Sequence, residues 1–202
     1  ELKKDIAKLN SAAEEGDPIA TPEFETVVLL DDFTASGTSF LREDGKGGWK
    51  GKIHKILDML DDDKEGLGAL MSKTGVKVSI SLYIAAPQAL EHLLPLLPQR
   101  GFARGDIEIQ VVHRLEPFTK LTSPMDDGIL NLVVNDEYWD DSADDEHAQV
   151  GGNSFRYGYA DCALPVVLSH NTPNNSIFLL WAGEGSNVHG LFPRVSRHRP
   201  FA

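Results

Sequence analysis

The chain has 202 residues, of which 41% are apolar, and at this length about 70% of the surface of the unfolded chain would be buried in one core. The formal net charge of −12 argues against nonspecific binding to duplex nucleic acid, because such binding needs clustered Lys and Arg side chains. Cys162 is the single cysteine, so an intrachain disulfide is excluded, a reducing compartment is favoured and we expect a buried, unactivated thiol.

The sequence contains no apolar stretch of about 18 residues and no apolar region of the signal-peptide type near Glu1. We therefore expect a cytoplasmic protein without membrane contacts. Its size favours a single domain over residues 1–202. Within it, the irregular and acidic stretch 117–152 is interpreted as an insertion or lid, and the carboxylates of 136–146 as solvated.

The apolar and polar residues alternate in patterns that predict strands and helices in turn. The run 26–33 is apolar on both faces and predicts a strand in the centre of a parallel sheet. A helix is expected over 53–60, where apolar residues recur at helical spacing, and strands over 76–84 and 107–111, where they alternate.

Two further elements complete the predicted order. Leucines over 90–97 predict a short helix that Pro95 and Pro98 bend or stop, and 164–168 predicts another strand. Strands that alternate with helices favour an α/β fold with an open, mostly parallel sheet flanked by helices. Ligands bind such sheets at the edge where the loops follow the strands.

Residues 31–39 combine an acidic pair with a turn of small and hydroxyl-bearing residues. Asp31 and Asp32 end the first strand, and the turn is expected to open a helix. Backbone N–H groups and the helix N-terminus would then face a phosphate, while the carboxylates accept hydrogen bonds from ribose hydroxyls or hold Mg²⁺ through water. The residues expected to bind phosphate are Ala35, Ser36, Gly37, Thr38 and Ser39. An ordinary strand end, in which these side chains only cap the next helix, is the alternative.

Other phosphate and metal motifs fit the sequence poorly. A P-loop is disfavoured, because Lys46 stands where its first glycine is needed and Ile53 where its hydroxyl is needed. No HExxH or comparable spacing indicates a resident metal site. A nuclease-like effector that uses acidic residues and His170 is therefore the weakest of the functional hypotheses.

The segment 170–175 follows the predicted strand 164–168 and should emerge at the same edge as the loop. Its polar side chains suit a base edge or a sugar, although turn chemistry alone also favours Asn, Thr and Pro here. The candidate ligand-binding residues are His170, Asn171, Asn174 and Asn175. Near the end of the sequence, Arg194, Arg197 and His198 could contact a diphosphate or nucleic acid, form a solvated tail or pair with 136–146.

The stretch from Val27 to Ser39 resembles the phosphoribosyl-diphosphate binding motif of phosphoribosyltransferases: four apolar residues, an acidic pair and a Thr/Ser-rich glycine loop. The resemblance implies that Asp31 and Asp32 lie on the ribose side and act in catalysis, and that 35–39 cradle the 5-phosphate. One difference is Ala35, where the family usually has threonine.

Three blocks, DDFTASGTSFL, ALPVVLSHNTPNNSIFLLW and LFPRVSRHRPF, together resemble a phosphoribosyltransferase-like family of bacterial conflict systems, which includes effectors found beside retron reverse transcriptases. This resemblance implies a role in antiphage defence, with partner proteins and a reverse transcriptase with its DNA product among its partners. Mg²⁺ is the cofactor that transferase chemistry would require.

Only 30 residues precede Asp31, whereas standard phosphoribosyltransferases supply a diphosphate-binding loop and a flexible loop from that side. Either an upstream half is missing from this chain or the domain is not a standard transferase. The leading hypothesis is a phosphoribosyltransferase-like domain that binds a ribose-5-phosphate-containing ligand, with or without enzymatic activity. The alternative is a non-catalytic nucleotide-sensing or partner-binding module.

Overall fold

The structure is a computed structural model. It describes residues 4–5, 8, 24–62, 67–144, 146–152, 154–183, 186 and 188–193. The chain divides into two compact units, which are described separately. Unit 1 comprises Glu1–Phe33, Ser39–Ile84 and Leu93–His113, and unit 2 comprises Thr34–Thr38, Ala85–His92 and Arg114–Ala202. The single domain over residues 1–202 stays a prediction.

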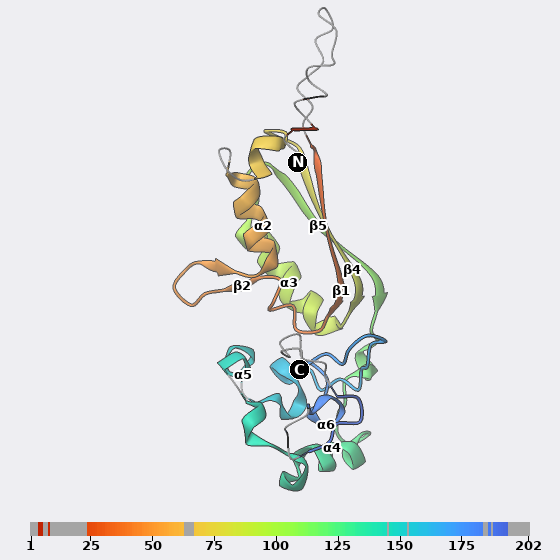
Figure 1. The fold of residues 1–202 in the computed structure, drawn as a ribbon. Helices are drawn as coiled ribbons and strands as arrows, with labels where there is room; N and C mark the ends of the chain where they lie inside the picture. Colours follow the sequence, from red (N-terminus) through yellow and green to blue (C-terminus); the bar gives the residue numbers. More distant parts are fainter. Residues whose placement is uncertain are drawn as a thin grey trace, which may run out of the picture. The chain divides into compact units, whose positions relative to one another are not determined.

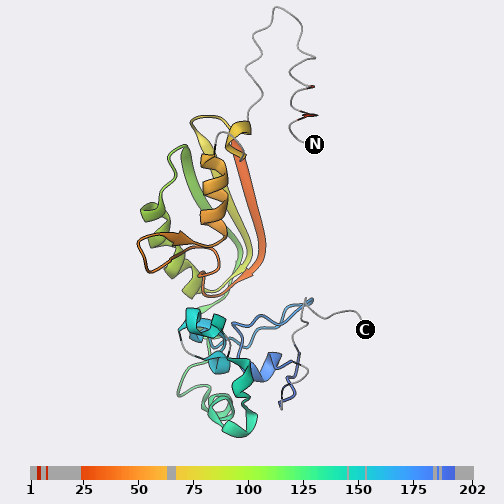
Figure 2. The same cartoon turned by 60° about the vertical axis from the view of Figure 1, so that its left-hand side comes forward.

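A three-stranded parallel sheet, in the order β1-β4-β5, organises unit 1 (Figure 1). Its strands are β1 (Thr26–Thr34), β4 (Val76–Ala85) and β5 (Gly105–Arg114). They are connected through helices α2 (Lys52–Asp61) and α3 (Pro87–Arg100). Right-handed crossovers that advance in one direction place their helices on one face of the sheet, and both views show α2 and α3 there (Figures 1 and 2). The predicted α/β class is confirmed.

The core of unit 1 follows the predicted periodicities. Alternate residues of β4 from Val76 to Leu82 are buried on the helix side of the sheet. Ile53, Leu57 and Leu60 form the buried stripe of α2, as their helical spacing predicts. The central strand and the first covering helix are thus determined by patterns that are local in the sequence.

Helix α3 corrects one prediction, because it continues past Pro95 and Pro98 to Arg100. Both prolines are exposed, whereas Leu93 and Leu97 of the same helix are buried. A proline on the solvent side of a helix leaves the freed carbonyl to water or to a side chain. The carbonyls that Pro95 and Pro98 free are those of Glu91 and Leu94, which are exposed residues of the helix.

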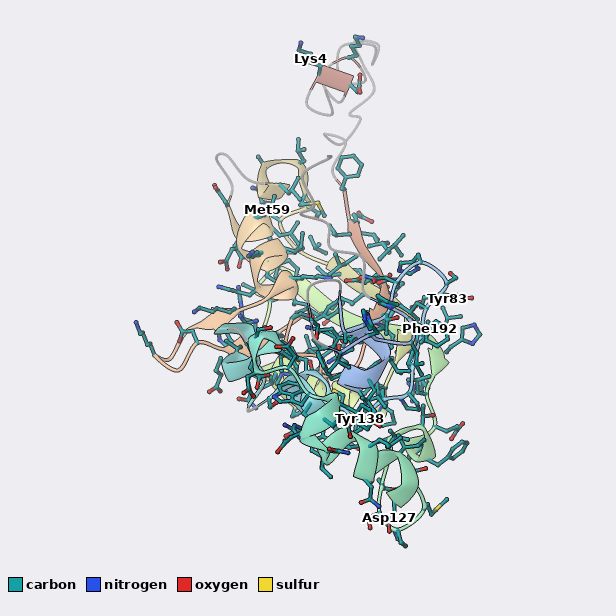
Figure 3. All side chains as sticks on the ribbon, turned by 60° about the horizontal axis from the view of Figure 1, so that its bottom comes forward. Lys4, Met59, Tyr83, Asp127, Tyr138 and Phe192 are labelled. Atoms are coloured by element: carbon teal, nitrogen blue, oxygen red, sulfur yellow. The ribbon has the colours of Figure 1, made fainter. Side chains whose placement is uncertain are left out.

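Strand β1 lies at the edge of the sheet, so its predicted central position is wrong. Val28 and Leu30 are 55% and 74% exposed, and no described element covers them. On the same face of β4, Tyr83 is 55% exposed and points outward (Figure 3). A continuous apolar run cannot distinguish burial on both faces from a strand with one uncovered face, because only a third element would make the difference.

A short hairpin precedes α2 in unit 1. Strands β2 (Arg42–Glu43) and β3 (Trp49–Lys50) pair antiparallel. In the turn between them, the Asp44 carboxylate accepts hydrogen bonds from Lys46 N at 2.7 Å and Gly48 N at 2.8 Å, and these bonds lower the pKa of Asp44. The glycine-rich stretch is thus an ordered hairpin.

Unit 2 is built mainly from short helices around aromatic side chains. Its helices beyond α3 are α4 (Asp127–Val134), α5 (Glu146–Gly151) and α6 (Phe178–Trp181). Single turns of 3-10 helix lie at Leu67–Leu70 in unit 1 and, in unit 2, at Pro117–Thr119, Asp136–Tyr138, Asp141–Ala143, Phe155–Tyr157 and Tyr159–Asp161. Trp181 makes edge-to-face contacts with Phe155 and Phe178, with centroids 5.5 Å and 5.1 Å apart.

The acidic stretch 117–152 contributes to this core of unit 2. Trp139 packs edge-to-face on Phe178, with centroids 4.7 Å apart, and Ala148 is buried in the same cluster. The Arg156 guanidinium lies 4.9 Å from the Trp139 ring centroid and donates to the Val134 carbonyl at 2.8 Å. Whether the stretch also acts as a lid stays a prediction.

The strand predicted over 164–168 does not form. The segment makes a single parallel bridge, between Leu164 and Ser176. Pro165 has no N–H group to donate to a ladder, and Ser176 uses its hydroxyl, instead of a strand register, to bind the Val166 carbonyl at 2.6 Å. The segment 170–175 therefore does not follow a strand, and other contacts determine its position.

We expect Leu82→Ala to lower the free energy of unfolding by about 2–5 kcal/mol, because the substitution leaves a cavity in the core. The matched control, Leu30→Ala, should change it by no more than about 0.5 kcal/mol, as is usual for exposed positions. The two leucines are 0% and 74% exposed in neighbouring strands. Urea titration measures both values, and an equal loss in the two variants would contradict an uncovered outer face of β1.

Candidate phosphate-binding site

The turn after β1 is compact and rich in hydroxyl groups. Ala35 and Ser36 are 1% and 7% exposed, and Gly37 adopts a φ of 75°, which favours glycine. The Ser36 and Thr38 hydroxyl oxygens lie 3.0 Å apart, and Thr38 donates to the phenol oxygen of Tyr159 at 3.2 Å. Residues 35–38 and Tyr159 belong to unit 2, whereas Ser39 belongs to unit 1.

The turn does not open a helix, contrary to the sequence prediction. Residues 38–40 form a turn, and the hairpin β2–β3 precedes the next helix, α2, which begins at Lys52. The N–H groups of Lys52 and Ile53 already donate to the carbonyls of Ser39 and Phe40 at 3.0 Å and 2.9 Å. A phosphate bound in the turn would therefore depend on local N–H groups and hydroxyls. The alternative, an ordinary strand end, loses only its expected helix cap, because Gly51 precedes α2 and no side chain caps the helix there.

Asp31 and Asp32 both lie within β1 and have different surroundings. Asp31 is partly buried and forms an ion pair with Lys52, while Asp32 is exposed. Successive residues of a strand point to opposite faces, and the exposure along β1 alternates accordingly. The Asp32 N–H donates to Asp31 Oδ1 at 3.1 Å.

A magnesium ion fits this acidic pair only in part. Side chains on opposite faces of one strand cannot both ligate a single ion, and Lys52 already neutralises Asp31. Among the described residues, no group of three or more His, Cys, Asp or Glu side chains is arranged to hold a metal. Mg²⁺ would therefore be held chiefly by ligand phosphates, as Mg²⁺ commonly is, and it would neutralise charge on them.

The segment 170–175 contacts Tyr159 of unit 2. The main-chain carbonyl of Asn174 accepts a hydrogen bond from Tyr159 N at 2.6 Å, and Asn175 Nδ2 donates to the Tyr159 carbonyl at 3.2 Å. His170 is exposed, and Asn171 Oδ1 accepts from Thr172 N at 3.0 Å. Their roles in ligand binding remain predictions. Arg194, Arg197 and His198 lie outside the described residues.

Sequence reasoning missed Tyr159 and Thr172. Thr172 is 2% exposed, and its hydroxyl donates to the Phe192 carbonyl at 2.8 Å. Tyr159 contacts Thr38 across 121 residues of sequence. Neither periodicity nor a short motif can indicate a contact between residues so far apart in the sequence. The local signal near Tyr159 is Gly158, since a glycine can adopt the positive φ found there.

Unit 2 also contains a cavity of about 330 Å³. Polar side chains from three segments line it: Gln88 and Glu91, Glu116 and Lys120, and Cys162. Cys162 is 1% exposed, as expected for a small buried residue, and burial raises the pKa of its thiol to about 11. The cavity is within the usual size range of small-molecule sites.

The parallel sheet with its covering helices, followed by a small-residue loop at the end of β1, defines an α/β protein of the phosphoribosyltransferase-like class. A family model described as PRTase-CE matches residues 2–194. The chain therefore belongs to the PRTase-CE family of phosphoribosyltransferase-like domains. No curated protein and no solved structure matches the sequence. Within the described residues, none of the helices has the length and apolar character needed to cross a membrane.

We expect native Cys162 to react with iodoacetamide about 100-fold more slowly at pH 8 than the unfolded chain, because a pKa of about 11 in place of 9.0 lowers the thiolate fraction by that factor. The thiol ionises first in the unfolded chain, so the stability should fall as the pH rises from about 9 towards about 11. Mass spectrometry of the single cysteine measures the rate. Equal rates in native and urea-unfolded protein would contradict a buried thiol.

Proposed function

We propose that the chain binds a ligand containing ribose 5-phosphate, either phosphoribosyl diphosphate or a nucleotide, through residues 35–39. The observation that carries the proposal is the turn itself, in which Gly37 has a positive φ and Ser36 and Thr38 place two hydroxyls 3.0 Å apart. Small side chains allow a phosphate to approach the backbone N–H groups closely. Membership of the PRTase-CE family supports the same ligand class.

The acidic pair has a proposed role in binding the ribose and in catalysis. Asp32 is exposed and would accept hydrogen bonds from the ribose hydroxyls. Asp31 would first have to give up its ion pair with Lys52 before it could bind a ribose hydroxyl. The Lys52 side chain is 48% exposed, so water would solvate its ammonium group once the pair separates. In a transferase, diphosphate would leave the anomeric carbon of the ribose, with Mg²⁺ neutralising its charge.

A non-catalytic nucleotide sensor is the second candidate. The ion pair between Asp31 and Lys52 favours it, because one of the two carboxylates is already neutralised by a cation of the chain. Such a module would bind the same ligand without turning it over. The two candidates share the loop and differ only in whether the bound ligand is consumed.

We further propose that the chain is an effector of bacterial antiphage defence. The support is the resemblance of the three sequence blocks to conflict-system proteins, some of which accompany retron reverse transcriptases. Its partners would be the other proteins of the module, including a reverse transcriptase with its DNA product, in the cytoplasm. The defence role would depend on ligand binding by the loop.

Phosphoribosyl diphosphate with Mg²⁺ should stabilise the protein against thermal unfolding, by about 2.7 kcal/mol at a hundred times its dissociation constant. Asp32→Asn should weaken or remove this stabilisation. The matched control is Asp106→Asn, an exposed aspartate at the amino end of β5, which should behave as the wild type. Stabilisation of wild type and both variants alike would contradict a role for Asp32, and stabilisation of none would contradict the ligand. Release of diphosphate by the wild type would favour the transferase over the sensor.

Cells that carry the complete defence module should lose protection from phage when the chain carries Asp32→Asn and keep it with Asp106→Asn. Plaque counts on matched strains measure the protection, and immunoblots verify equal amounts of protein. Full protection by the Asp32→Asn strain would separate the defence role from the ribose site.

A further inference from the structure

A chain of hydroxyl groups extends from the loop to a tyrosine far away in the sequence. Ser36 Oγ and Thr38 Oγ1 are 3.0 Å apart, and Thr38 Oγ1 is 3.2 Å from the phenol oxygen of Tyr159. All three residues belong to unit 2, and the described contacts between them lie within that unit. The phenol is thus adjacent to the turn that the proposed function assigns to the phosphate.

The backbone around Tyr159 is fixed on both sides. Its N–H donates to the Asn174 carbonyl at 2.6 Å, and its carbonyl accepts from Asn175 Nδ2 at 3.2 Å. Gly158, which precedes it, has a φ of 78°, and a Cβ there would lie 2.3 Å from the Asn175 carbonyl oxygen. Only glycine permits this approach, so residues 174–175 determine where Tyr159 lies.

The residues after Tyr159 have a strained backbone. Ala160, Asp161 and Ala163 have φ values of 57°, 49° and 46°, in the left-handed region that non-glycine residues rarely adopt. Gln88 Nε2 holds the Ala160 carbonyl at 2.9 Å, and Ala163 N donates to the Tyr157 carbonyl at 2.7 Å. Such strain persists where the surroundings impose it, and it gathers at ligand-binding and catalytic positions.

The chemistry of the phenol suits an anion. A phenol accepts and donates one hydrogen bond each in the usual case, and Thr38 donates into its oxygen. The phenol proton is then directed to another acceptor, and a phosphate offers several. Residues 35–39 contain no Lys or Arg, so the donors that the turn itself offers to a phosphate are neutral.

We propose that Tyr159 is a phosphate-binding residue whose phenol donates to the phosphate in the turn, and that Asn174 and Asn175 are positioning residues that act through it. This inference rests on the proposed binding of a 5-phosphate. It assigns two of the three asparagines of segment 170–175, Asn174 and Asn175, to the support of Tyr159, and it adds a donor that the sequence motif of the loop does not contain.

The test is the affinity for ribose 5-phosphate and for phosphoribosyl diphosphate with Mg²⁺, measured by calorimetry. Tyr159→Phe keeps the ring, which packs on Phe155 with centroids 6.0 Å apart, and removes only the hydroxyl. Loss of a hydrogen bond to a charged group should raise the dissociation constant roughly 10- to 100-fold. The matched control, Tyr157→Phe, should bind as the wild type does. Asn175→Ala should weaken binding in the same direction as Tyr159→Phe.

The outcomes separate this inference from the proposed function. Wild-type affinity in Tyr159→Phe would overturn the role of Tyr159 and leave the loop as the phosphate site, whereas no binding by the wild type would overturn both. A second readout does not depend on the folding of Tyr159→Phe. Ligand should perturb the ultraviolet difference spectrum of tyrosine in the wild type and in Tyr157→Phe, and a spectrum without that change, despite binding, would also refute the inference.

Discussion

The pairing of β4 with a parallel strand on each side is the constraint from which the rest of the described structure follows. At the carboxyl ends, the register is set by hydrogen bonds from Ala86 N to the Thr34 carbonyl and from Leu115 N to the Ala85 carbonyl, both 2.9 Å. Parallel strands direct the segments that follow them to one edge. The segments that follow the three strands are the turn 34–38, the start of α3 and the chain from residue 114, and all of them are part of unit 2.

Within unit 2, hydrogen bonds replace regular secondary structure as the means of placing side chains. Several single turns of 3-10 helix follow one another along the chain of this unit. Between residues 158 and 163, three non-glycine residues adopt the left-handed backbone conformation. Aromatic packing around Trp181 supplies the apolar contact that such short elements cannot supply alone, and the Trp181 indole donates to the Ser176 carbonyl at 2.8 Å. A loop-rich unit with a dense core can hold polar groups in fixed positions.

The sequence predicted those parts of the fold that depend on residues close together in the chain. Periodicity located α2, β4 and β5, because the apolar residues of each element lie on the one face that packs against the core and so recur at a helical or strand spacing. It misplaced β1, since a run such as 27–30 carries no information on what covers it. It allowed for an end of α3 near Pro95, whereas the helix continues to Arg100 because Pro95 lies on the solvent side. The turn 35–38 was located from its residue types, but its partner Tyr159 depends on a contact between distant segments. The helix expected directly after the turn does not form there, because the hairpin β2–β3 lies between the turn and α2.

The uncovered position of β1 has a colloidal consequence. An edge strand presents unpaired backbone N–H and C=O groups, which act as a template for another strand unless charges, prolines or bulges interrupt them. Residues 26–30, Thr-Val-Val-Leu-Leu, contain no charge and no proline, and Val28 and Leu30 are exposed. Within the described chain, β1 is thus an edge open to strand addition by a second copy. A lysine in place of Val28 or Leu30, which are exposed, would act on self-association without touching the core.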